Sequence, residues 1–357
     1  APITTWTLTV LCGTGHVVYT MFPIIYDIAI KKNIRPERPM AVASIASQLG
    51  VCASPMSVAV VSLVSILAHS HGIGNAISLI DVLKVAMPAS FSGMILAALW
   101  SLRRGKNLKD DKEFQEKIKD PNQRNYIYGD MENSLQNKKL TKESYRSLFI
   151  FFATIAVVIV FGSFESLRPH YIDNGKTVSL SMNLIIQIFM LLSGACILIF
   201  CKVIPREVPE SAIFKAGMTA IISVFGVAWM ADTFFQFHFE FIKSSLEHIV
   251  TSKPWTYAII LALVSSLVNS QAAAIAAIAP MGLALGLDPK IIVAFLPAAY
   301  CYFLLPIYPS DLACIGFDRS GTTHIGKFII NHSFIIPGLI AITTSCFVGY
   351  LLVQIAF

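Results

Sequence analysis

Nine apolar runs, most of them long enough to cross a bilayer, make up the greater part of this chain. A helix needs about 20 apolar residues to span the hydrocarbon core, where its backbone polar groups must bond within the segment. Hydrophobic residues form 55% of the sequence and charged residues only 13%, against about 25% charged residues in soluble domains. The sequence therefore predicts an all-α polytopic membrane protein. The runs are 3–30, 40–68, 76–102, 147–164, 178–201, 212–231, 255–285, 290–316 and 328–357.

Two regions, about 254 residues apart, share one layout of interruptions, a pattern typical of secondary transporters that marks the substrate site. In each region small polar residues interrupt one apolar run, a turn containing Pro follows, and Pro breaks the next run. We therefore expect inverted repeats with re-entrant hairpins and broken helices around a midplane site. The first region contains Gly13-Thr-Gly-His16, Asn33-Ile-Arg-Pro36 and Ser54-Pro-Met-Ser57, and the second contains Asn269-Ser-Gln271, Gly286-Leu-Asp-Pro289 and Pro306-Ile-Tyr-Pro-Ser-Asp311.

The distribution of Lys and Arg orients the chain. Residues 103–146 carry twelve of them, so this segment is predicted to be cytoplasmic, with a short amphipathic helix near 109–119 and a turn at Pro121. The run 255–285 reads either as one crossing or as a re-entrant hairpin. We favour the hairpin because it keeps Arg319 on the cytoplasmic side of the membrane and gives the second repeat the opposite orientation to the first. The predicted divisions are a first repeat at 1–102, the charged loop at 103–146, and a second repeat at 147–357 with an external amphipathic segment at 232–254 and a periplasmic C-terminus.

The two polar tips are candidate anion sites. Two glycines around Thr14 break a helix and expose backbone N–H groups, which suit a carboxylate, although Gly-x-Gly is also a helix-packing motif. Three consecutive polar side chains at Asn269-Ser-Gln271 are costly in lipid unless they face protein, water or ligand. Interhelical hydrogen bonding is the structural alternative. The prediction places one substrate carboxylate at Gly13, Thr14, Gly15, Ser54 and Ser57, and the other at Asn269, Ser270, Gln271 and Ser310.

Further candidates surround the breaks. Asp311 is an intramembrane carboxylate, which could bind a coupling proton or cation or form a structural ion pair. His16 could carry a proton or simply pack. Arg319 with Thr322 and Thr323 could grip a carboxylate, or form an ordinary cytoplasmic turn. Prolines remove backbone donors and free carbonyls beside the predicted site, and the prolines concerned are Pro55, Pro306 and Pro309. Tyr308, which precedes Pro309, is a further candidate for substrate binding.

Several function classes lack their signatures. The sequence has no GxxxxGK[ST], HExxH or GxSxG motif, and none of its seven cysteines forms a CxxC pair. We therefore expect no enzyme activity, cofactor or metal. An intramembrane enzyme would have to combine Ser54 or Ser57 with His16. The net charge of +6 comes from loops between apolar runs and does not indicate nucleic-acid binding.

The chain resembles the Dcu family of anaerobic C4-dicarboxylate transporters over essentially its whole length. Within this family it is most similar to the members that exchange fumarate for succinate. Family members are longer at the N-terminus, so we expect this chain to be N-terminally truncated. The motifs that carry the resemblance are Gly13-Thr-Gly-His-Val-Val-Tyr-Thr20, Asn33-Ile-Arg-Pro-Glu-Arg-Pro-Met40, Val268-Asn-Ser-Gln-Ala-Ala-Ala274, Tyr308-Pro-Ser-Asp-Leu312 and Phe317-Asp-Arg-Ser-Gly-Thr-Thr-His-Ile-Gly326.

The resemblance implies a multi-pass antiporter of the bacterial inner membrane, similar to the elevator-type carriers of the ion-transporter superfamily. It would take in fumarate, malate or aspartate in exchange for succinate during anaerobic growth. The resemblance also implies a homodimer in the lipid bilayer and a membrane sensor kinase as a partner. The alternative function is a sensory or scaffolding protein that partners such a kinase and keeps only a vestigial transport site. The polar side chains at both tips favour transport, because a vestigial site would be expected to fill with Leu and Val.

Overall fold

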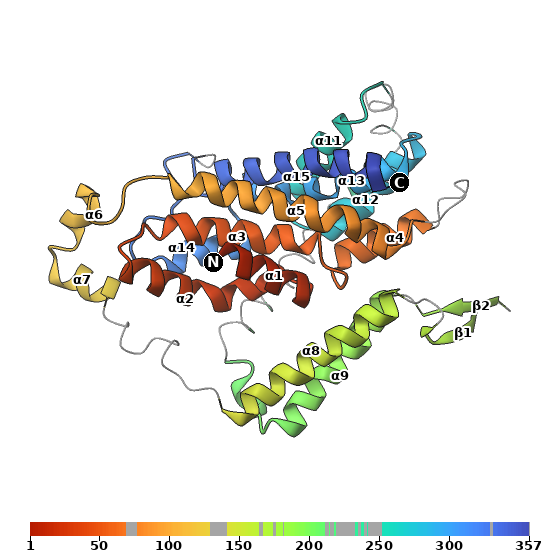
Figure 1. Cartoon of the computed structure of the whole chain (residues 1–357), viewed down its shortest axis with the longest axis horizontal. Coiled ribbons are helices and arrows are strands. Elements are labelled where there is room, and N and C mark those ends of the chain that lie inside the picture. Colours follow the sequence, from red (N-terminus) through yellow and green to blue (C-terminus); the bar gives the residue numbers. More distant parts are fainter. Residues whose placement is uncertain are drawn as a thin grey trace.

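The computed structural model describes most of the chain and is almost entirely helical where it is described (Figure 1). The described residues are 1–68, 77–128, 141–163, 167–173, 176–180, 182–210, 252–328 and 331–356, with a few single positions between 211 and 251. The predicted all-α class is confirmed. The apolar run 212–231 and the external segment 232–254 lie largely outside the described residues.

The helices before the charged loop form a hairpin, a broken helix and a long helix, in that order. Pro2 begins the first helix at a position where its missing N–H is no loss. The long helix begins with a capping box between Ser78 and Asp81. The bounds are α1 Pro2–Cys12, the 3-10 turn η1 Gly15–Val17, α2 Val18–Lys31, α3 Glu37–Val51, α4 Val58–Ala68 and α5 Leu79–Leu102.

The same order returns near the end of the chain. The run 255–285 is a hairpin and not one continuous helix, as predicted. A broken helix and a second long helix follow. The bounds are α11 Thr256–Val268, α12 Gln271–Ala284, α13 Pro289–Ala294, the 3-10 helix η6 Leu296–Leu304, α14 Pro309–Phe317 and α15 Ile335–Ala356.

The two sets of elements run in opposite directions (Figure 1). The turn between α2 and α3 lies beside the segment that leaves α5, since Leu108 donates a backbone hydrogen bond of 3.3 Å to Asn33. Gly349, near the C-terminal end of α15, packs against the carbonyl of Ala294 at the end of α13. Gly338, near the start of α15, packs against Phe303 in η6. The second broken helix therefore runs antiparallel to α15, from the end of the molecule opposite the α2–α3 turn.

The long helices α5 and α15 lie side by side and join the two repeats (Figure 1). Gly93 of α5 faces Ala341 and Ser345 of α15 so closely that any Cβ at this position would collide with both residues. The close approach of the two helices therefore depends on glycine at position 93.

The apolar core has two main parts that meet at the end of α3. One part gathers side chains from α4, α11, α12 and α13 and includes Cys52. The other gathers side chains from α2, α3, η6 and α14 and includes Leu49. The break after α3 thus lies between two well-packed blocks, which fixes its position in the molecule.

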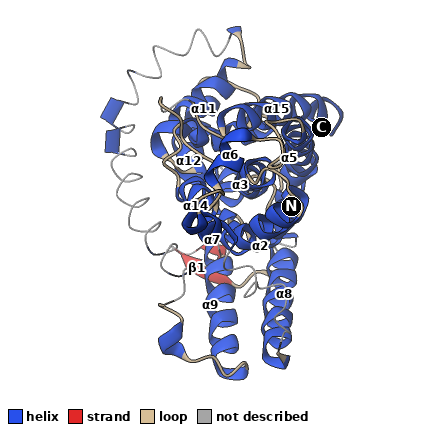
Figure 2. Cartoon of the chain, turned by 90° about the vertical axis from the view of Figure 1, so that its left-hand side faces the viewer, coloured by secondary structure: helices blue, strands red, loops and turns tan. Residues whose placement is uncertain are grey.

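A further helix pair lies beside this body (Figure 2): α8 Lys142–Ser163 and α9 Met182–Phe200. It packs on the first repeat through a small cluster that includes Met56, Val61 and Ile155. A two-stranded antiparallel ribbon, β1 His170–Asp173 and β2 Lys176–Ser179, joins the two helices. The predicted apolar run 178–201 therefore starts too early, because its first residues pair as a strand and α9 begins only at Met182. The 3-10 turn η5 Pro205–Glu207 follows α9.

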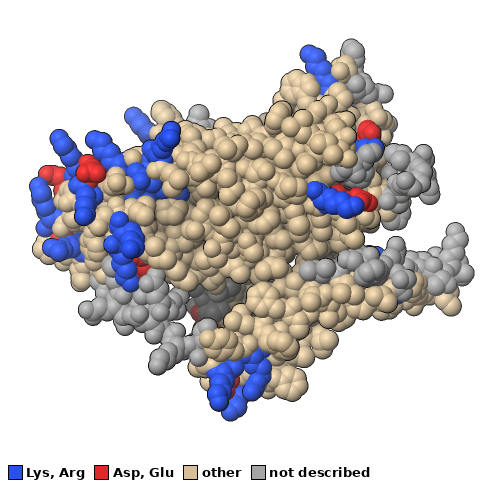
Figure 3. Space-filling model, viewed as in Figure 1, with Lys and Arg blue, Asp and Glu red and all other residues tan. Residues whose placement is uncertain are grey.

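Two short helices cap one end of the body: α6 Lys112–Lys117 and α7 Pro121–Tyr128. The predicted turn at Pro121 is wrong, since Pro121 begins α7, where a residue without an N–H is well tolerated. Phe114 and Ile127 anchor these helices in the core. Lys and Arg gather at this end of the surface, as Figure 3 shows.

Among the described helices, two are long and apolar enough to cross a membrane on their own. They are Leu79–Ser101 and Ile335–Ile355. The pair Pro289–Leu304 and Pro309–Phe317 passes the same test together and bends by 55° at its break. The hairpin helices α1, α11 and α12 are shorter than a full span.

Candidate functional site

The two hairpin tips have the same backbone geometry. Gly13 follows α1 with φ 71°, and Asn269 follows α11 with φ 53°, so both chains turn through the left-handed region. The next residues, Thr14 and Ser270, are extended, and each hydroxyl accepts a 3.3 Å hydrogen bond from a backbone N–H of the helical segment that follows. The two repeats therefore place a capping hydroxyl at matching positions.

The first tip presses against the broken helix. A Cβ at Gly13 would lie 2.9 Å from the Cβ of Met56, in the break between α3 and α4. A Cβ at Gly15 would collide with the side-chain amide of Gln48 in α3. Both positions therefore require glycine because the tip approaches the broken helix closely, and position 13 requires it also because its φ is positive.

Gln48 is the hydrogen-bonding centre of the site. Its amide oxygen accepts a 2.7 Å bond from the Tyr302 hydroxyl, and its Nε2 donates a 3.3 Å bond to Ser310. Gln271, the first residue of α12, donates a 2.7 Å bond to the backbone carbonyl of Gln48 and a 3.3 Å bond to the Tyr302 hydroxyl. The second tip, η6, α14 and α3 therefore meet at one buried residue.

Asp311 is fully buried in the first turn of α14. Its Oδ1 accepts a 2.7 Å hydrogen bond from Ser44 of α3, whereas its Oδ2 has no partner among the described residues. No Lys or Arg in the described part of the chain forms an ion pair with it. An ionised carboxylate buried with one neutral donor is costly, and a proton or a bound cation would remove that cost.

Other buried polar atoms near the tips also lack a partner among the described residues: the ring Nδ1 of His16, the hydroxyls of Tyr19 and Tyr300, and Oδ1 of Asn269. An unpaired buried polar atom costs about 1–3 kcal/mol. These atoms come from both repeats, and their unmet hydrogen-bonding capacity suits a polar ligand or water.

Aromatic rings line the same region. His16 stacks between Tyr19, with ring centroids 5.7 Å apart, and Tyr308, at 6.4 Å. Tyr308 in turn contacts Tyr302 at 4.4 Å. This row of rings connects the first tip with the break before α14 and restricts the rotamers of the side chains around Gln48.

Comparison with known proteins identifies the family. A family model described as an anaerobic C4-dicarboxylate membrane transporter matches residues 1–357. The chain belongs to this family. It is a membrane protein, as its apolar helices and its family indicate.

Named relatives of this family member cover nearly its whole sequence. It is 53% identical over 351 residues to the anaerobic C4-dicarboxylate transporter DcuB of Escherichia coli O6:H1, covering 98% of this chain and 78% of the relative. It is 33% identical to the C4-dicarboxylate transporter DcuA of Wolinella succinogenes, covering 99% of this chain and 78% of the relative. The corresponding DcuA of Escherichia coli K12 is 31% identical, with coverages of 99% and 78%. No solved structure matches the chain.

The structure of this C4-dicarboxylate transporter family member brings many of the predicted residues together. His16, Gln271 and Tyr308 lie around Gln48 and Tyr302, and Ser310 and Asp311 join them from α14. Gly13, Thr14, Gly15, Asn269 and Ser270 form the two tips. Pro306 lies in the break before α14, and Pro309 is the first residue of that helix.

The predicted serines of the first break have structural partners. The Ser54 hydroxyl donates a 2.7 Å bond to the carbonyl of Val10, which ties the break to α1. Ser57 caps α4 by accepting a 3.2 Å bond from the N–H of Val60, and Pro55 lies between the two serines. Neither serine forms a hydrogen bond with His16 among the described residues, and the ring Nδ1 of His16 has no partner there, so the serine–histidine pair that an intramembrane enzyme would need is not formed.

A second polar cluster lies at the other end of α14, where the sequence predicted a carboxylate grip. Thr322 donates a 2.8 Å bond to Asp318, and the backbone N–H of Thr323 donates to the same carboxylate at 2.6 Å. Arg319 lies over the Tyr26 ring, and its guanidinium is 4.0 Å from Asp27. Most donors of this loop thus have partners inside the protein, but the buried Thr323 hydroxyl has none among the described residues. Contact of this loop with substrate stays a prediction.

Four further residues of the site were not predicted from the sequence: Ser44, Gln48, Tyr302 and Tyr19. Ser44 and Gln48 are one helical turn apart, so they share a face of α3, and this polar pair within an apolar run was the signal available. Gln48 and Tyr302 are 254 residues apart, the spacing of the two repeats. Comparison of each polar residue in the run 40–68 with the residue 254 positions later would have paired Gln48 with Tyr302.

Proposed function

We propose that this chain carries C4-dicarboxylates across the bacterial inner membrane, taking in fumarate, malate or aspartate in exchange for succinate during anaerobic growth. Relatives at 53% and 33% identity are named anaerobic C4-dicarboxylate transporter and C4-dicarboxylate transporter. The observation that carries the proposal is the convergence of both hairpin tips on Gln48 and Tyr302, with unpartnered polar atoms from both repeats around them. The sensory alternative gains no support from these names.

The substrate's two carboxylates would be held by the two tips. Thr14 and Ser270 each accept a backbone hydrogen bond, which leaves the hydroxyl proton free to bond an anion. Helices α12 and α14 begin within the cluster, and a helix N-terminus carries a partial positive charge. Hydroxyls, amides and helix N-termini would therefore bind the dianion without an Arg or Lys side chain.

Asp311 would be neutral while the dianion is bound. An ionised carboxylate beside a substrate carboxylate would repel it in a medium of low dielectric constant. A protonated Asp311 could instead donate from Oδ2, the atom that has no partner within the described residues. The same neutral side chain would serve fumarate and succinate, so that exchange of one dianion for the other moves no net charge.

The orientation of the chain is proposed from its charges. Lys and Arg gather at the end that carries α6 and α7 (Figure 3), and we assign this end to the cytoplasm by the positive-inside rule. The chain would then cross the membrane several times, with hairpins opening toward opposite sides. The divisions 1–102, 103–146 and 147–357 are proposed as first repeat, cytoplasmic loop and second repeat. A homodimer and a sensor-kinase partner are proposed from the family resemblance alone.

The test of this function is radiolabelled fumarate uptake into proteoliposomes that contain the purified protein. Vesicles preloaded with succinate should accumulate label rapidly, whereas empty vesicles should accumulate almost none, because the carrier returns only when it is loaded. Butyrate, which has one carboxylate, should not support uptake from inside. Equal uptake into empty and loaded vesicles would contradict exchange, and no uptake in either would contradict transport.

A further inference from the structure

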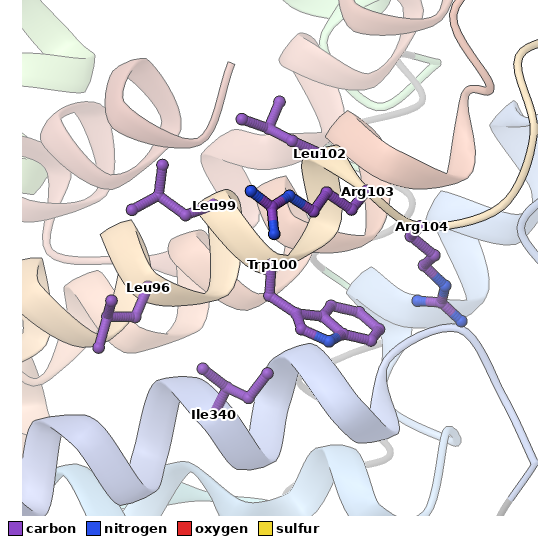
Figure 4. Close-up of a pocket in the computed structure, with 7 residues that line it drawn as sticks. All are labelled: Leu96, Leu99, Trp100, Leu102, Arg103, Arg104 and Ile340. Atoms are coloured by element: carbon purple, nitrogen blue, oxygen red, sulfur yellow. The ribbon is translucent and has the colours of Figure 1, made fainter.

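A groove with a cavity volume of about 730 Å³ lies along the last turns of α5 and beside α15 (Figure 4). Two arginines lie at the end of α5, and leucines continue along the helix away from them. The groove is within the size range of small-molecule sites, about 300–1,000 Å³. Its lining residues are Leu96, Leu99, Trp100, Leu102, Arg103, Arg104 and Ile340.

The apolar part of the groove faces outward from the protein. Leu99 is 54% exposed and Leu102 is 67% exposed. They belong to one of the two described helices that are long and apolar enough to span a bilayer alone. Leucines that face outward on such a helix contact acyl chains rather than water.

The two arginines have different surroundings. Arg104 forms a 2.8 Å ion pair with Glu37, bonds the carbonyl of Ser333, and lies 5.5 Å from the centre of the Trp100 ring. Arg103 has no carboxylate partner among the residues that the structure describes, and it is exposed at the end of α5. The guanidinium of Arg103 is therefore available to an anion from outside the protein.

We propose that this groove binds an anionic phospholipid of the cytoplasmic leaflet, with the lipid phosphate on Arg103. A guanidinium matches the oxygens of a phosphate diester geometrically. Trp100 lies at the level where indole rings meet lipid headgroups and glycerol. The leucines and Ile340 then cover the upper part of an acyl chain. Basic pockets between membrane helices on the cytoplasmic side bind anionic headgroups in this way.

Two other occupants fit the groove less well. A free phosphate would use Arg103 but would leave the exposed leucines without a partner. A second copy of the chain packed symmetrically on this face would bring two groove surfaces with unpaired Arg103 together, and such like charges repel. The combination of an unpaired cation, an indole and aliphatic side chains is complementary to a lipid. This assignment rests on the proposed cytoplasmic side of α6 and α7, but not on the substrate.

Quenching of Trp100 fluorescence by brominated lipid tests the proposal. The protein has four tryptophans, so the signal of Trp100 is obtained as the difference between the native chain and Trp100→Phe. Each is reconstituted in phosphatidylcholine with a small mole fraction of either dibrominated phosphatidylglycerol or dibrominated phosphatidylcholine. We expect the brominated phosphatidylglycerol to quench Trp100 several-fold more strongly at equal mole fraction.

Substitutions of Arg103 test whether its charge causes the preference for phosphatidylglycerol. Arg103→Gln should remove the preference for phosphatidylglycerol, and Arg103→Lys should keep part of it. Arg124→Gln on α7, an exposed site that loses the same charge, should leave the preference unchanged. Equal quenching by both lipids in the native chain, or a preference that survives Arg103→Gln, would overturn the proposal. Absence of quenching by either lipid would show that protein covers the groove, and would overturn it as well.

Discussion

The Tyr302 hydroxyl donates a 2.7 Å hydrogen bond to the side-chain oxygen of Gln48, and the two residues are 254 residues apart, which is about the spacing of the two repeats. This bond joins α3 of the first broken helix to η6 of the second. It also fixes the Gln48 amide, whose Nε2 then points toward Ser310.

Tyr302→Phe removes this donor while it keeps the ring that packs against Tyr308. Without the bond, the Gln48 amide can rotate, and the buried oxygen loses a partner that is worth about 1 kcal/mol. We expect fumarate–succinate exchange in proteoliposomes to fall about 5-fold, since a loss of about 1.4 kcal/mol would correspond to a factor of 10, with unchanged protein yield. Tyr145→Phe, at an exposed position on α8, is the matched control. Exchange at the native rate in Tyr302→Phe would exclude this role for the bond.

Asp311→Asn tests whether the buried carboxyl works in its neutral form. Asparagine has nearly the same shape, can accept from Ser44 and can donate where Oδ2 lies. We expect the variant to retain exchange within a few-fold of the native rate, and Asp311→Ala to lose most of it. Loss of exchange in both variants would mean that the site needs the ionised carboxylate together with a bound cation. Rates measured at several Na⁺ concentrations would identify that cation.

Gly93→Ala tests the contact between α5 and α15. A methyl group at this position collides with Ala341 and Ser345, and overpacking of this kind costs about 1–3 kcal/mol. The thermal unfolding midpoint of the detergent-solubilised protein should therefore fall by several degrees. Gly194→Ala is the control, because that exposed glycine of α9 has no atom within 4 Å of an added Cβ, and alanine improves helix propensity. An equal or higher midpoint for Gly93→Ala would show that the helices separate easily.

Thr322→Val separates a structural role from a substrate grip at the end of α14. The hydroxyl accepts a 3.1 Å bond from the backbone N–H of Glu37 and donates to Asp318. Its loss leaves a buried N–H unpaired, so we expect a lower unfolding midpoint and an unchanged KM for fumarate. Thr343→Val, at an exposed position on α15, serves as the control. A raised KM with an unchanged midpoint would instead support contact with the substrate.

The breaks in the apolar pattern were predictable because lipid tolerates few polar or helix-breaking residues. Gly13, Asn269, Pro55 and Pro309 each mark a turn or a helix start in the structure, as the sequence indicated. These residues act locally, through φ angles and missing N–H groups, and local effects can be read from sequence.

The polar contacts between elements were harder to predict. Gln48 lies inside a continuous helix, and its importance arises only because η6 and α12 fold against it. Asp318 and Thr322 resembled an exposed donor loop, but the structure pairs them with each other. The short ribbon at His170–Asp173 escaped notice because its partner strand overlaps an apolar run. In each case the interacting residue is distant in the sequence, or it lies in a segment that the apolar pattern assigned to a different element.

The central claim is that the two tips hold the two carboxylates of one substrate. Asn269→Gly is the variant of choice, because glycine keeps the positive φ of the second tip and removes only the side-chain amide, whose Nδ2 is the atom that could donate to a carboxylate. The measurement is inhibition of fumarate–succinate exchange by succinate and by butyrate, in the native chain and in the variant. We expect succinate affinity to fall about 10-fold while butyrate affinity stays the same, since a hydrogen bond to a charged group is worth about 1.5–3 kcal/mol and butyrate can still use the first tip. Equal losses for both acids, or no loss for either, would contradict it.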